Sequence, residues 1–578
     1  MPAGQAWILR RRTFAEPPPA YAGLDPLLAR VLYARKIEDR DDVRAFLGDA
    51  PDEGNPFLLR DMRQAVARLL WAVHHGEQIV VYGDYDTDGV TATALLLGAL
   101  ERIGARVRPY IPDRFAEAYG LNMPALDALR AEGAALVVTV DCGIRSVAEA
   151  AHATEIGLEM VITDHHSVPE VLPEALAVID PKQPDCPYPF EDLAGVGLAY
   201  RLVQALYAAW NATLPPDEPP AIAEQFLDLV ALGTVADIVP LVGENRALVR
   251  HGLETLRQTA RPGLRALIAA AGVSPERLNA QDIAFRLGPR LNAAGRLESA
   301  DLSLGLLTAT DPVEGRTLAA RLNEINQERQ QLLERQVAAA TATLEAEGDP
   351  AERPILFVAR DDLNEGIVGL IASRLAEQFY LPTLVMRANG EGVRGSARSI
   401  EGFHITHALE SCSEHLTRFG GHAMAAGFSL ATENLEPFRR ALEEHAAACL
   451  PAGSPLLNRR LDVDVRVPLA ALTMESVRAL ASLEPCGEAN PPAVLATTGL
   501  TIRDLRPVGR EGQHCRLFLA DGSAGLAAIA FRMGEIAEEY RVGDVVDVAY
   551  TPSVNAYNGS ESVQLEVQAI RRHGAGAQ

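Results

Sequence analysis

Between residues 78 and 240, short apolar runs rich in β-branched residues alternate with longer amphipathic stretches. The apolar runs are QIVVY (78–82), VRPYIP (107–112), ALVVTV (135–140), MVIT (160–163) and ALAVID (175–180). The amphipathic stretches have helical periodicity and cover residues 90–104, 123–132, 146–156, 196–211 and 221–233. Uninterrupted apolar runs are typical of strands that are buried on both faces of a parallel sheet. Strands separated by helices therefore predict an α/β fold with a doubly wound, mostly parallel sheet.

A long helix is predicted downstream of this sheet, over residues 316–348. The stretch contains no Gly or Pro before Gly348, and its apolar residues form one helical stripe of Leu318, Leu322, Ile325, Leu332, Leu333 and Val337. At ~1.5 Å per residue, this helix would span roughly 48 Å. Its length and charge favour a rod that connects two lobes over an ordinary core helix.

Two further patterns follow the long helix. PILFVA (354–359), a helix around 366–379 and PTLVM (382–386) begin a second α/β unit, which ends with a helix near 434–449. Beyond it, short alternating runs broken by Gly, Asn and Asp predict a small β-barrel of the OB type. We therefore predict an N-terminal segment with an irregular start, a first α/β domain, connecting helices, a second α/β domain and a barrel, at residues 1–50, 51–300, 301–350, 351–452 and 453–572.

The composition indicates which class of protein the chain belongs to. With 48% hydrophobic and 22% charged residues, the chain resembles ordinary globular proteins. It has no apolar run long enough to span a membrane and no apolar core of a signal peptide near its N-terminus. Six scattered cysteines without a CxxC pair suit a reducing compartment, so we expect a cytoplasmic protein. The net charge of −24 argues only weakly against a nucleic-acid partner, because a basic path can coexist with an acidic exterior.

Acidic and imidazole side chains stand directly after three of the apolar runs. They are Asp84, Asp86 and Asp88 after the run at 78–82, Asp141 after the run at 135–140, and Asp164, His165 and His166 after the run at 160–163. Because the carboxyl ends of parallel strands meet at one edge of a sheet, we expect these side chains to converge in one crevice. Carboxylates held that close repel one another. The pattern therefore predicts a positive charge between them, best supplied by two divalent metal ions.

Each of these residues also has a simpler explanation. The Asp-x-Asp-x-Asp-Gly pattern occurs in EF-hands, but Leu95 stands where a calcium loop needs its glutamate. The three aspartates could point the same way from an extended strand or wrap around an ion in a Gly-bounded turn. Asp141 and Asp164 could each cap a helix, and a lone histidine on an apolar strand is usually a core residue. The joint placement at strand ends favours the metal site.

Asp237, which follows a helix and a Gly-Thr turn, would complete the set of ligands. Oxygen-rich ligands with one or two imidazoles favour Mn²⁺ or Mg²⁺ over zinc. Two such ions close together are typical of hydrolysis at phosphorus. The chain has no Walker motif, so nucleotide-driven chemistry has no support in the sequence.

Four of these motifs, DYDTDG (84–89), VDCG (140–143), DHH (164–166) and TVAD (234–237), occur in this order. The ordered set resembles the motifs of the DHH phosphoesterase superfamily. RGSARS (394–399) and GGHAMAAG (420–427) resemble its DHH-associated second domain. The two lobes, the rod and the barrel together are similar to the single-strand-specific exonucleases of this superfamily, over about residues 50–570.

The resemblance implies a role for each residue at the strand ends. One cation would be held by Asp88, Asp141, His165 and Asp237, and the second by Asp84 and Asp86 with Asp141 shared. His166 would contact the scissile phosphate and stabilise charge in the transition state. Asp164 would orient a ligand histidine or cap its turn.

The resemblance also implies residues that bind the phosphates of the substrate. These are Arg114, Arg296, Ser396, Arg398 and His422. Alternatively, Arg114 would only pair with Asp113 or Glu117, and Arg296 with Glu298. In the barrel, the aromatic residues available for stacking on bases are Phe518, Phe531, Tyr540, Tyr550 and Tyr557, of which Tyr557 is the predicted stacking residue.

The activity that the resemblance implies is a single-stranded-DNA-specific 5′→3′ exonuclease of DNA repair and recombination, with Mn²⁺ or Mg²⁺ as cofactors. One alternative is a phosphodiesterase of the same superfamily that acts on oligonucleotides or cyclic dinucleotides. Another is an inactive scaffold that binds DNA. The implied partners are single-stranded DNA, a single-strand-binding protein and a RecQ-like helicase, with no membrane and a monomeric state.

Overall fold

A computed structural model describes residues 6–574 apart from 11–13, 15–16, 49–53, 115–116, 118–119, 389–391 and 558–559. The chain forms two compact units. The first unit comprises residues 14–326 and 478–492. The second comprises residues 327–477 and 493–578 together with the N-terminal strand. In the described part of the chain, no helix combines the length and apolar character needed to cross a membrane.

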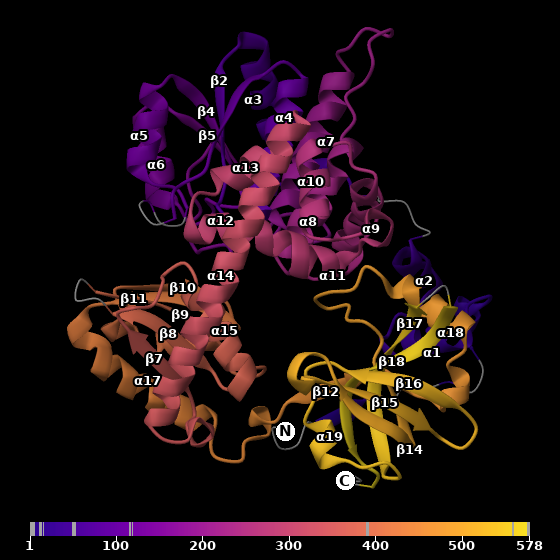
Figure 1. The fold of residues 1–578 in the computed structure, drawn as a ribbon. Coiled ribbons are helices and arrows are strands. Elements are labelled where there is room, and N and C mark those ends of the chain that lie inside the picture. The colour runs from indigo at the N-terminus through magenta and orange to yellow at the C-terminus, as the bar shows by residue number, and fades with distance from the viewer. Residues whose placement is uncertain are drawn as a thin grey trace. The chain divides into compact units, whose positions relative to one another are not determined.

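A five-stranded parallel sheet forms the centre of the first unit. Its strands, in the order β3-β2-β4-β5-β6, are β3 (Arg106–Tyr110), β2 (Gln78–Tyr82), β4 (Ala134–Val140), β5 (Glu159–Thr163) and β6 (Ala177–Ile179). Helices connect the strands and cover both faces (Figure 1): α4 (Thr87–Arg102), α5 (Met123–Ala131), α6 (Val147–Glu155) and α7 (Gly195–Asn211). The predicted doubly wound parallel sheet is confirmed.

The two faces of this sheet explain why its strands are apolar without interruption. Val80 and Val137 pack against α5 and α6 in one core. Val81 and Leu136 point the other way and pack with α4, α7 and α3 (Met62–His75) in the larger core. Alternate residues of a strand face opposite sides, so a strand covered on both sides needs apolar residues at every position.

The strand order places a topological switch point between β2 and β4. From β2 the chain leaves to β3 on one side and then crosses to β4 on the other side. Connections that depart in opposite directions leave a crevice at the carboxyl ends of the two central strands, where ligands bind in such folds. The acidic residues after β2 and β4 stand at this crevice.

The rest of the first unit is helical. Its main helices are α1 (Pro26–Ala34), α2 (Arg40–Leu47), α8 (Leu227–Ala236), α9 (Gly243–Arg257), α10 (Pro262–Ala270), α12 (Gly288–Leu297) and α13 (Asp301–Thr308). The predicted Gly-Thr turn before Asp237 is wrong, because Gly233 and Thr234 lie inside α8. Gly233 is required there for packing: a Cβ on it would come within 2.3 Å of the hydroxyl of Thr91 on α4. Close helix packing, rather than a turn, explains this glycine.

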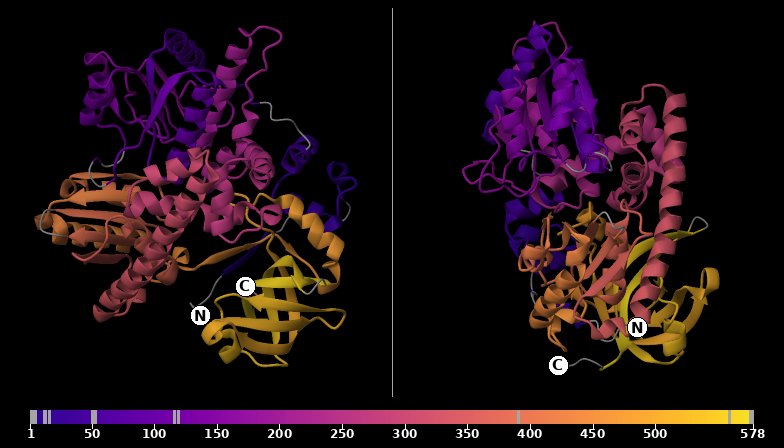
Figure 2. Two further views of the ribbon diagram at one scale, coloured as in Figure 1. Left: turned by 45° about the horizontal axis from the view of Figure 1, so that its top comes forward. Right: turned by 90° about the vertical axis from the view of Figure 1, so that its left-hand side faces the viewer.

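The predicted long helix is α14 (Pro312–Ala346), which has 35 residues. It begins four residues before the predicted start, at a proline, which is tolerated in the first helical turn. Figure 2 shows α14 as one unbroken helix. Its residues up to Asn326 belong to the first unit and the remainder to the second.

The second unit contains a mixed sheet in the order β10-β11-β9-β8-β7. Its strands are β7 (Leu356–Arg360), β8 (Thr383–Ala388), β9 (Val393–Arg398), β10 (Arg418–Gly421) and β11 (Ala425–Leu430). Only β7 and β8 run parallel. The helices of this α/β part include α15 (Val368–Phe379), the short α16 (Ile405–Glu410) and α17 (Leu435–Cys449).

A closed barrel completes the second unit. Its strands are β14 (Leu495–Val508), β15 (His514–Ala520), β16 (Gly525–Ala530), β17 (Val545–Tyr557) and β18 (Ser560–Arg572). They pair in the order β14-β15-β16-β18-β17, and β17 pairs back with β14 to close the barrel. The β16–β18 pair is parallel, which confirms the predicted OB-like barrel.

The predicted irregular start of the chain is wrong for Ala6–Leu9. These residues form strand β1, which pairs in parallel with β12 (Arg460–Val463), the strand that leads toward the barrel. The partner strand lies far along the sequence, and four residues offer too short a pattern to predict a strand. Its pairing rather than its own propensity makes this segment a strand.

Candidate metal centre

The loop after β2 turns directly into α4. Asp86 is the N-cap of α4, and its side chain accepts a hydrogen bond from the backbone N–H of Gly89 at 3.1 Å. A Cβ on Gly89 would lie 2.7 Å from the backbone of Asp84, so only glycine fits where the loop closes over the helix. The three aspartates therefore wrap around the start of a helix and do not extend along the strand.

Asp88 and Asp141 meet at the N-terminus of α7. The carboxylate of Asp88 is buried and accepts hydrogen bonds from the backbone N–H groups of Gly195 at 2.6 Å and Val196 at 2.9 Å. Asp141 follows β4 with φ +61°, a left-handed conformation that aspartate tolerates better than most residues. A Cβ on Gly195 would come within 2.6 Å of the Asp141 Cβ, so this glycine allows Asp141 to approach the helix.

Asp164 holds the loop after β5. One carboxylate oxygen accepts hydrogen bonds from the backbone N–H groups of His165 at 2.8 Å and His166 at 3.2 Å, and contacts His166 Nδ1 at 2.7 Å. The other oxygen accepts from the N–H of Ile144 at 2.9 Å, which joins the loops after β4 and β5. Asp164 therefore fixes the loop that carries both histidines and orients the ring of His166.

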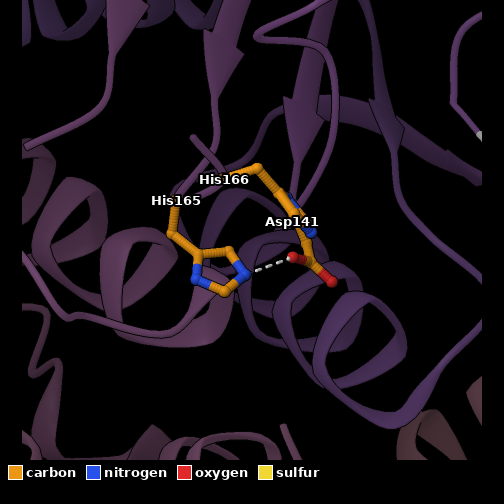
Figure 3. A group of neighbouring side chains, drawn as sticks. All are labelled: Asp141, His165 and His166. Atoms are coloured by element: carbon orange, nitrogen blue, oxygen red, sulfur yellow. Dashed lines mark ion pairs between the residues drawn. The ribbon is translucent and has the colours of Figure 1, made fainter. Parts of the chain in front are cut away.

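His165 lies at the centre of the carboxylates. Its Nε2 is 3.0 Å from Asp141 Oδ1, 3.6 Å from Asp237 Oδ2 and 3.9 Å from Asp88 Oδ2. Figure 3 shows the ring of His165 pointing at the carboxylate of Asp141. Asp237 reaches the cluster from the C-terminal end of α8. Side chains from four separate segments thus converge at the switch point of the sheet.

Electrostatics at this cluster favour a bound cation. Burial and the neighbouring carboxylates raise the pKa values of Asp84, Asp141 and Asp237 well above their usual range, and that of Asp88 to about 7. One buried oxygen of Asp84 has no hydrogen-bond partner among the described residues. A divalent cation would relieve both the repulsion and the missing contact.

The ligand atoms form three groups that could hold a metal ion. They are Asp88 with His165 and Asp237, Asp84 with Asp86 and Asp141, and Asp141 with His165 and His166; within each group, the ligand atoms lie within 4.8 Å of one another. The donors are mainly carboxylate oxygens with imidazole, which fits Mn²⁺ or Mg²⁺. The first group contains three of the four residues of the first predicted ligand set, without Asp141, and the second group has the three residues of the second set. The assignment of these residues to two cations stays a prediction.

Of the predicted phosphate-binding residues, Arg114 and Arg296 lie in the first unit. The Arg114 guanidinium carbon is 4.9 Å from the ring centroid of Tyr85, which stands between Asp84 and Asp86. Glu298, the alternative partner predicted for Arg296, forms an ion pair with Arg321. Positive charge is therefore placed at the edge of the carboxylate cluster.

Ser396, Arg398 and His422 lie in the second unit. Arg398 Nη1 donates to Ser396 Oγ at 2.7 Å, and both residues are on β9. Arg398 pairs across the sheet with Ala425, whose carbonyl accepts the backbone N–H of His422 at 2.8 Å. These three residues therefore gather at one end of the β9–β11 pair.

Two further polar residues near the loop that carries His165 and His166 were not predicted from the sequence. Asp180 directly follows β6, as the predicted ligands follow the other strands, and is fully buried. Lys182 donates from Nζ to the carbonyl oxygen of His165. Two signals in the sequence could have identified them: the acid at the end of a predicted strand, and a lysine in a chain with only one other, at position 36.

Asp180 makes a pH-dependent contribution to stability that can be measured. Burial raises its pKa from 3.8 to about 7, and one of its oxygens has no hydrogen-bond partner among the described residues. The folded protein therefore binds this proton more tightly than the unfolded protein, and the resulting stability is lost as pH rises from about 4 through about 7. We expect Asp180→Asn to match the wild type at pH 4 and to be more stable at pH 8 by about 2–4 kcal/mol.

Unfolding by urea at several pH values, with Mg²⁺ present throughout, would test this expectation. The amide of asparagine keeps the acceptor for the backbone N–H of Lys182. Asp185→Asn, at an exposed position nearby, is the matched control. Parallel stability curves for Asp180→Asn and the wild type would contradict the assignment.

Comparison with known proteins adds independent evidence. Three family models match: "DHH family, N-terminal domain" at residues 78–234, "DHHA1 domain" at 353–448 and "RecJ OB domain" at 463–569. The single-stranded-DNA-specific exonuclease RecJ of Bacillus subtilis is 38% identical, over 94% of this chain and 68% of the relative. The exonuclease of the same name from Salmonella typhimurium is 36% identical, over 97% of this chain and 98% of the relative.

Solved structures agree with these matches. The crystal structure of RecJ from Thermus thermophilus in complex with Mn²⁺ superposes with a TM-score of 0.83 and 31% identity, covering 99% of this chain and 80% of that one. The structure of the same protein with Mg²⁺ gives a TM-score of 0.77 and 29% identity, covering 98% and 78%. The chain therefore belongs to the RecJ family of single-stranded-DNA-specific exonucleases.

Proposed function

We propose that this protein is a metal-dependent exonuclease that hydrolyses the phosphodiester bonds of single-stranded DNA from the 5′ end. The convergence of Asp88, Asp141, Asp237 and His165 at the switch point carries the proposal. Membership of the RecJ family supports the same substrate and reaction. The 5′→3′ direction rests on the resemblance alone.

Two divalent cations, Mn²⁺ or Mg²⁺, are the proposed cofactors. Asp88, Asp141, His165 and Asp237 would hold the first, and Asp84, Asp86 and the shared Asp141 the second. When bound, the cations would supply Lewis-acid activation of the attacking water and compensation of charge on the leaving oxygen. The crystal structures of the Thermus relative in complex with Mn²⁺ and with Mg²⁺ support both choices of metal.

His166 is the proposed donor to the scissile phosphate. Burial alone would lower the pKa of His166, but its hydrogen bond to Asp164 and the negative charges of Asp164 and Asp86 raise the pKa. The same contact, against the opposing effect of burial, holds the pKa of Asp164 at about 2. A positively charged His166 would therefore stabilise negative charge that develops on the phosphate.

Arginine and hydroxyl groups would position the strand. We propose that Arg114 and Arg296 bind phosphates next to the metal centre, and that Ser396, Arg398 and His422 bind the strand on the second unit. The planar guanidinium matches a phosphate with two parallel hydrogen bonds. The stacking of Arg114 on Tyr85 supports this role. Burial and the charge of Asp86 raise the pKa of Asp84, and the nearby cation of Arg114 opposes part of that rise.

The barrel offers a face for single-stranded DNA. On β15, His514, Arg516 and Phe518 alternate with buried residues and point outward. The ring of Phe531 lies 5.4 Å from that of His514. We propose that bases stack on Phe518 and Phe531 while Arg516 binds a phosphate. Two other aromatic candidates, Tyr540 and Tyr550, are buried, and the side chain of Tyr557 lies outside the described residues.

Digestion of a long single strand, labelled at either end, would test the proposal. In Mn²⁺, we expect a 5′ label to be released at once in a mononucleotide, and a 3′-labelled strand to shorten progressively. The same strand in a blunt duplex should resist digestion, and EDTA should stop all hydrolysis. A single-strand-binding protein and a RecQ-like helicase stay predicted partners, and the monomeric state stays predicted as well.

Two outcomes would favour the alternatives. Cleavage confined to di- to pentanucleotides or to cyclic dinucleotides would identify a small-substrate phosphodiesterase. Binding of single strands without hydrolysis in either metal would identify an inactive scaffold. Release of mononucleotides from the 3′ end would contradict the proposed polarity and leave the metal centre unaffected.

A further inference from the structure

Two exposed apolar side chains belong to segments that adjoin the metal centre. Among the large hydrophobic residues that the structure describes, Phe285 (77% exposed) and Ile238 (69%) are the most exposed. Ile238 directly follows Asp237. Phe285 belongs to a π-helical turn, Ile283–Leu287, that packs against α8, the helix that ends before Asp237. Where exposed apolar side chains form one patch rimmed by polar groups, that patch marks a binding site.

The backbone of Ile238 has a conformation that is unfavourable for a β-branched residue. Its φ is +65°, in the left-handed region, where a β-branched residue is an outlier. Since the side chain is exposed, burial does not compensate for this strain. Residues that keep an unfavourable conformation without adding to the core are typical of functional sites. Ile238 is therefore better explained by contact with a substrate than by its contribution to the fold.

Helix α12 links the turn that carries Phe285 to the loop after β2, which carries Asp84 and Asp86. Thr87, the first residue of α4, donates from its hydroxyl to the carbonyl of Gly288 at 3.3 Å and from its backbone N–H to Asn292 Oδ1 at 2.8 Å. A Cβ on Gly288 would lie 3.2 Å from the Cβ of Ala236, at the end of α8. Phe285 precedes Gly288 by about one helical turn. Such π-helical turns are rare and are frequently found at functional sites.

Two arginines accompany the apolar pair. Arg286 follows Phe285 and is exposed, and Arg290 Nη1 donates to the carbonyl of Arg286 at 2.6 Å. Burial and the charge of Arg286 lower the pKa of Arg290. Asp282 lies 3.4 Å from Arg286 and offsets part of its charge, and Arg290 Nε donates to Asn323 Oδ1 at 3.1 Å. A bound phosphate would offset the remaining positive charge of the pair. A surface that combines exposed apolar groups with paired arginines matches the bases and phosphates of a nucleic acid strand.

We propose that Ile238 and Phe285 form a platform for the bases next to the scissile phosphate, and that Arg286 and Arg290 bind the phosphates between those bases. The proposal rests on the proposed function, because it takes single-stranded DNA as the ligand. An unpaired base offers its whole face to such a platform and can stack whatever its identity. The faces of a base inside a duplex are covered by its neighbours, so the platform would select single strands.

A comparison of intact and abasic strands would test the platform. One substrate is a 5′-phosphorylated oligothymidylate, and the other is the same strand with abasic residues at its first few 5′ positions. Phe285→Ala and Ile238→Asn should each lower kcat/KM on the intact strand about tenfold, mainly through KM. Neither should change kcat/KM on the abasic strand. Asparagine tolerates the left-handed backbone at position 238, so this variant should fold.

Ile222→Asn is the matched control, because Ile222 is also exposed and lies in the loop before α8. It should leave both substrates unaffected. Equal losses on the intact and abasic strands, or no loss on either, would overturn the platform.

Binding provides a second readout that does not depend on hydrolysis. In an Asp141→Asn background, fluorescence anisotropy should show the same selective loss of affinity for the intact strand. If the wild type failed to hydrolyse single strands while this selective loss remained, the proposed function would be overturned and the platform would stand. If the wild type hydrolysed them while the loss was absent, the platform alone would be overturned.

Discussion

Replacing Asp141 with asparagine should lower kcat/KM on single-stranded DNA by at least about a thousandfold. Asp141 is buried, lies 3.0 Å from His165 and belongs to two of the three groups that could hold a metal ion. As the proposed ligand of both cations, Asp141 would contribute several kcal/mol of transition-state stabilisation, and each 1.4 kcal/mol corresponds to a factor of about ten. Asparagine is preferred to alanine because it adopts the left-handed backbone of this position more readily.

The folded state should tolerate the same change. In the metal-free protein, Asp141→Asn removes a buried carboxyl that repels Asp88, Asp86 and Asp237, so its melting temperature should equal or exceed that of the metal-free wild type. In Mn²⁺ the order should reverse, because the wild type gains more from binding the metal. Isothermal titration with Mn²⁺ should show weaker binding to the variant.

Asp217→Asn, on an exposed loop, should change neither activity nor metal affinity. Activity of Asp141→Asn within tenfold of the wild type would show that Asp141 is not a shared metal ligand. Loss of folding without metal would show instead that its role is structural.

Replacing Arg246 with methionine should weaken the attachment of residues 478–492 to the rest of the first unit. All five N–H groups of the buried Arg246 side chain donate to backbone carbonyls, those of Phe46, Ser482, Leu483, Glu484 and Pro485, at 2.8–3.0 Å. These bonds tie residues 482–485 to α9 and to the end of α2. Without the guanidinium, several buried carbonyls would lose their donors, at about 1–3 kcal/mol for each group left unsatisfied.

We expect the free energy for local opening of residues 478–492 to fall by about 3–5 kcal/mol, since part of the loss is recovered by hydration. Hydrogen exchange of the amides in this segment measures that quantity directly, without assuming that the whole chain unfolds in one step. Arg246→Lys should show an intermediate loss, because an ammonium has three donors rather than five.

Arg265→Met, at an exposed position on α10, is the control and should leave exchange unchanged. Unaltered exchange in Arg246→Met would contradict the proposed anchoring role. Activity of Arg246→Met at low temperature should remain close to that of the wild type, because Arg246 takes no part in the metal centre.

Much of the first unit could be predicted because its strands have a strong local signature. QIVVY was predicted as a strand at residues 78–82 and forms β2 with the same bounds, and the run at 160–163 differs from β5 by one residue. Strands covered on both faces must be apolar throughout, so burial is visible in the sequence itself. The acids that follow these strands could then be placed at one edge of the sheet before any contact was known.

Other features depend on contacts between distant residues and leave no local signature. Strand β1 exists because it pairs with β12, and four of the five bonds of Arg246 join α9 to residues 482–485, more than 200 residues away. Gly233 resembled a turn residue, but it is a packing contact between α4 and α8. The order of residue types along the chain indicates periodicity and burial. It does not indicate which other element a given helix packs against.

The sequence by itself determined the parallel sheet, the long helix, the barrel and the set of acidic and imidazole residues at the strand ends. Each of these is expressed in the order and periodicity of neighbouring residues. Only the tertiary structure decided that His165 stands between Asp88, Asp141 and Asp237, that Asp164 orients His166, and that Ile238 and Phe285 stay exposed. These relations depend on how separate segments pack in space, which sequence spacing alone does not determine.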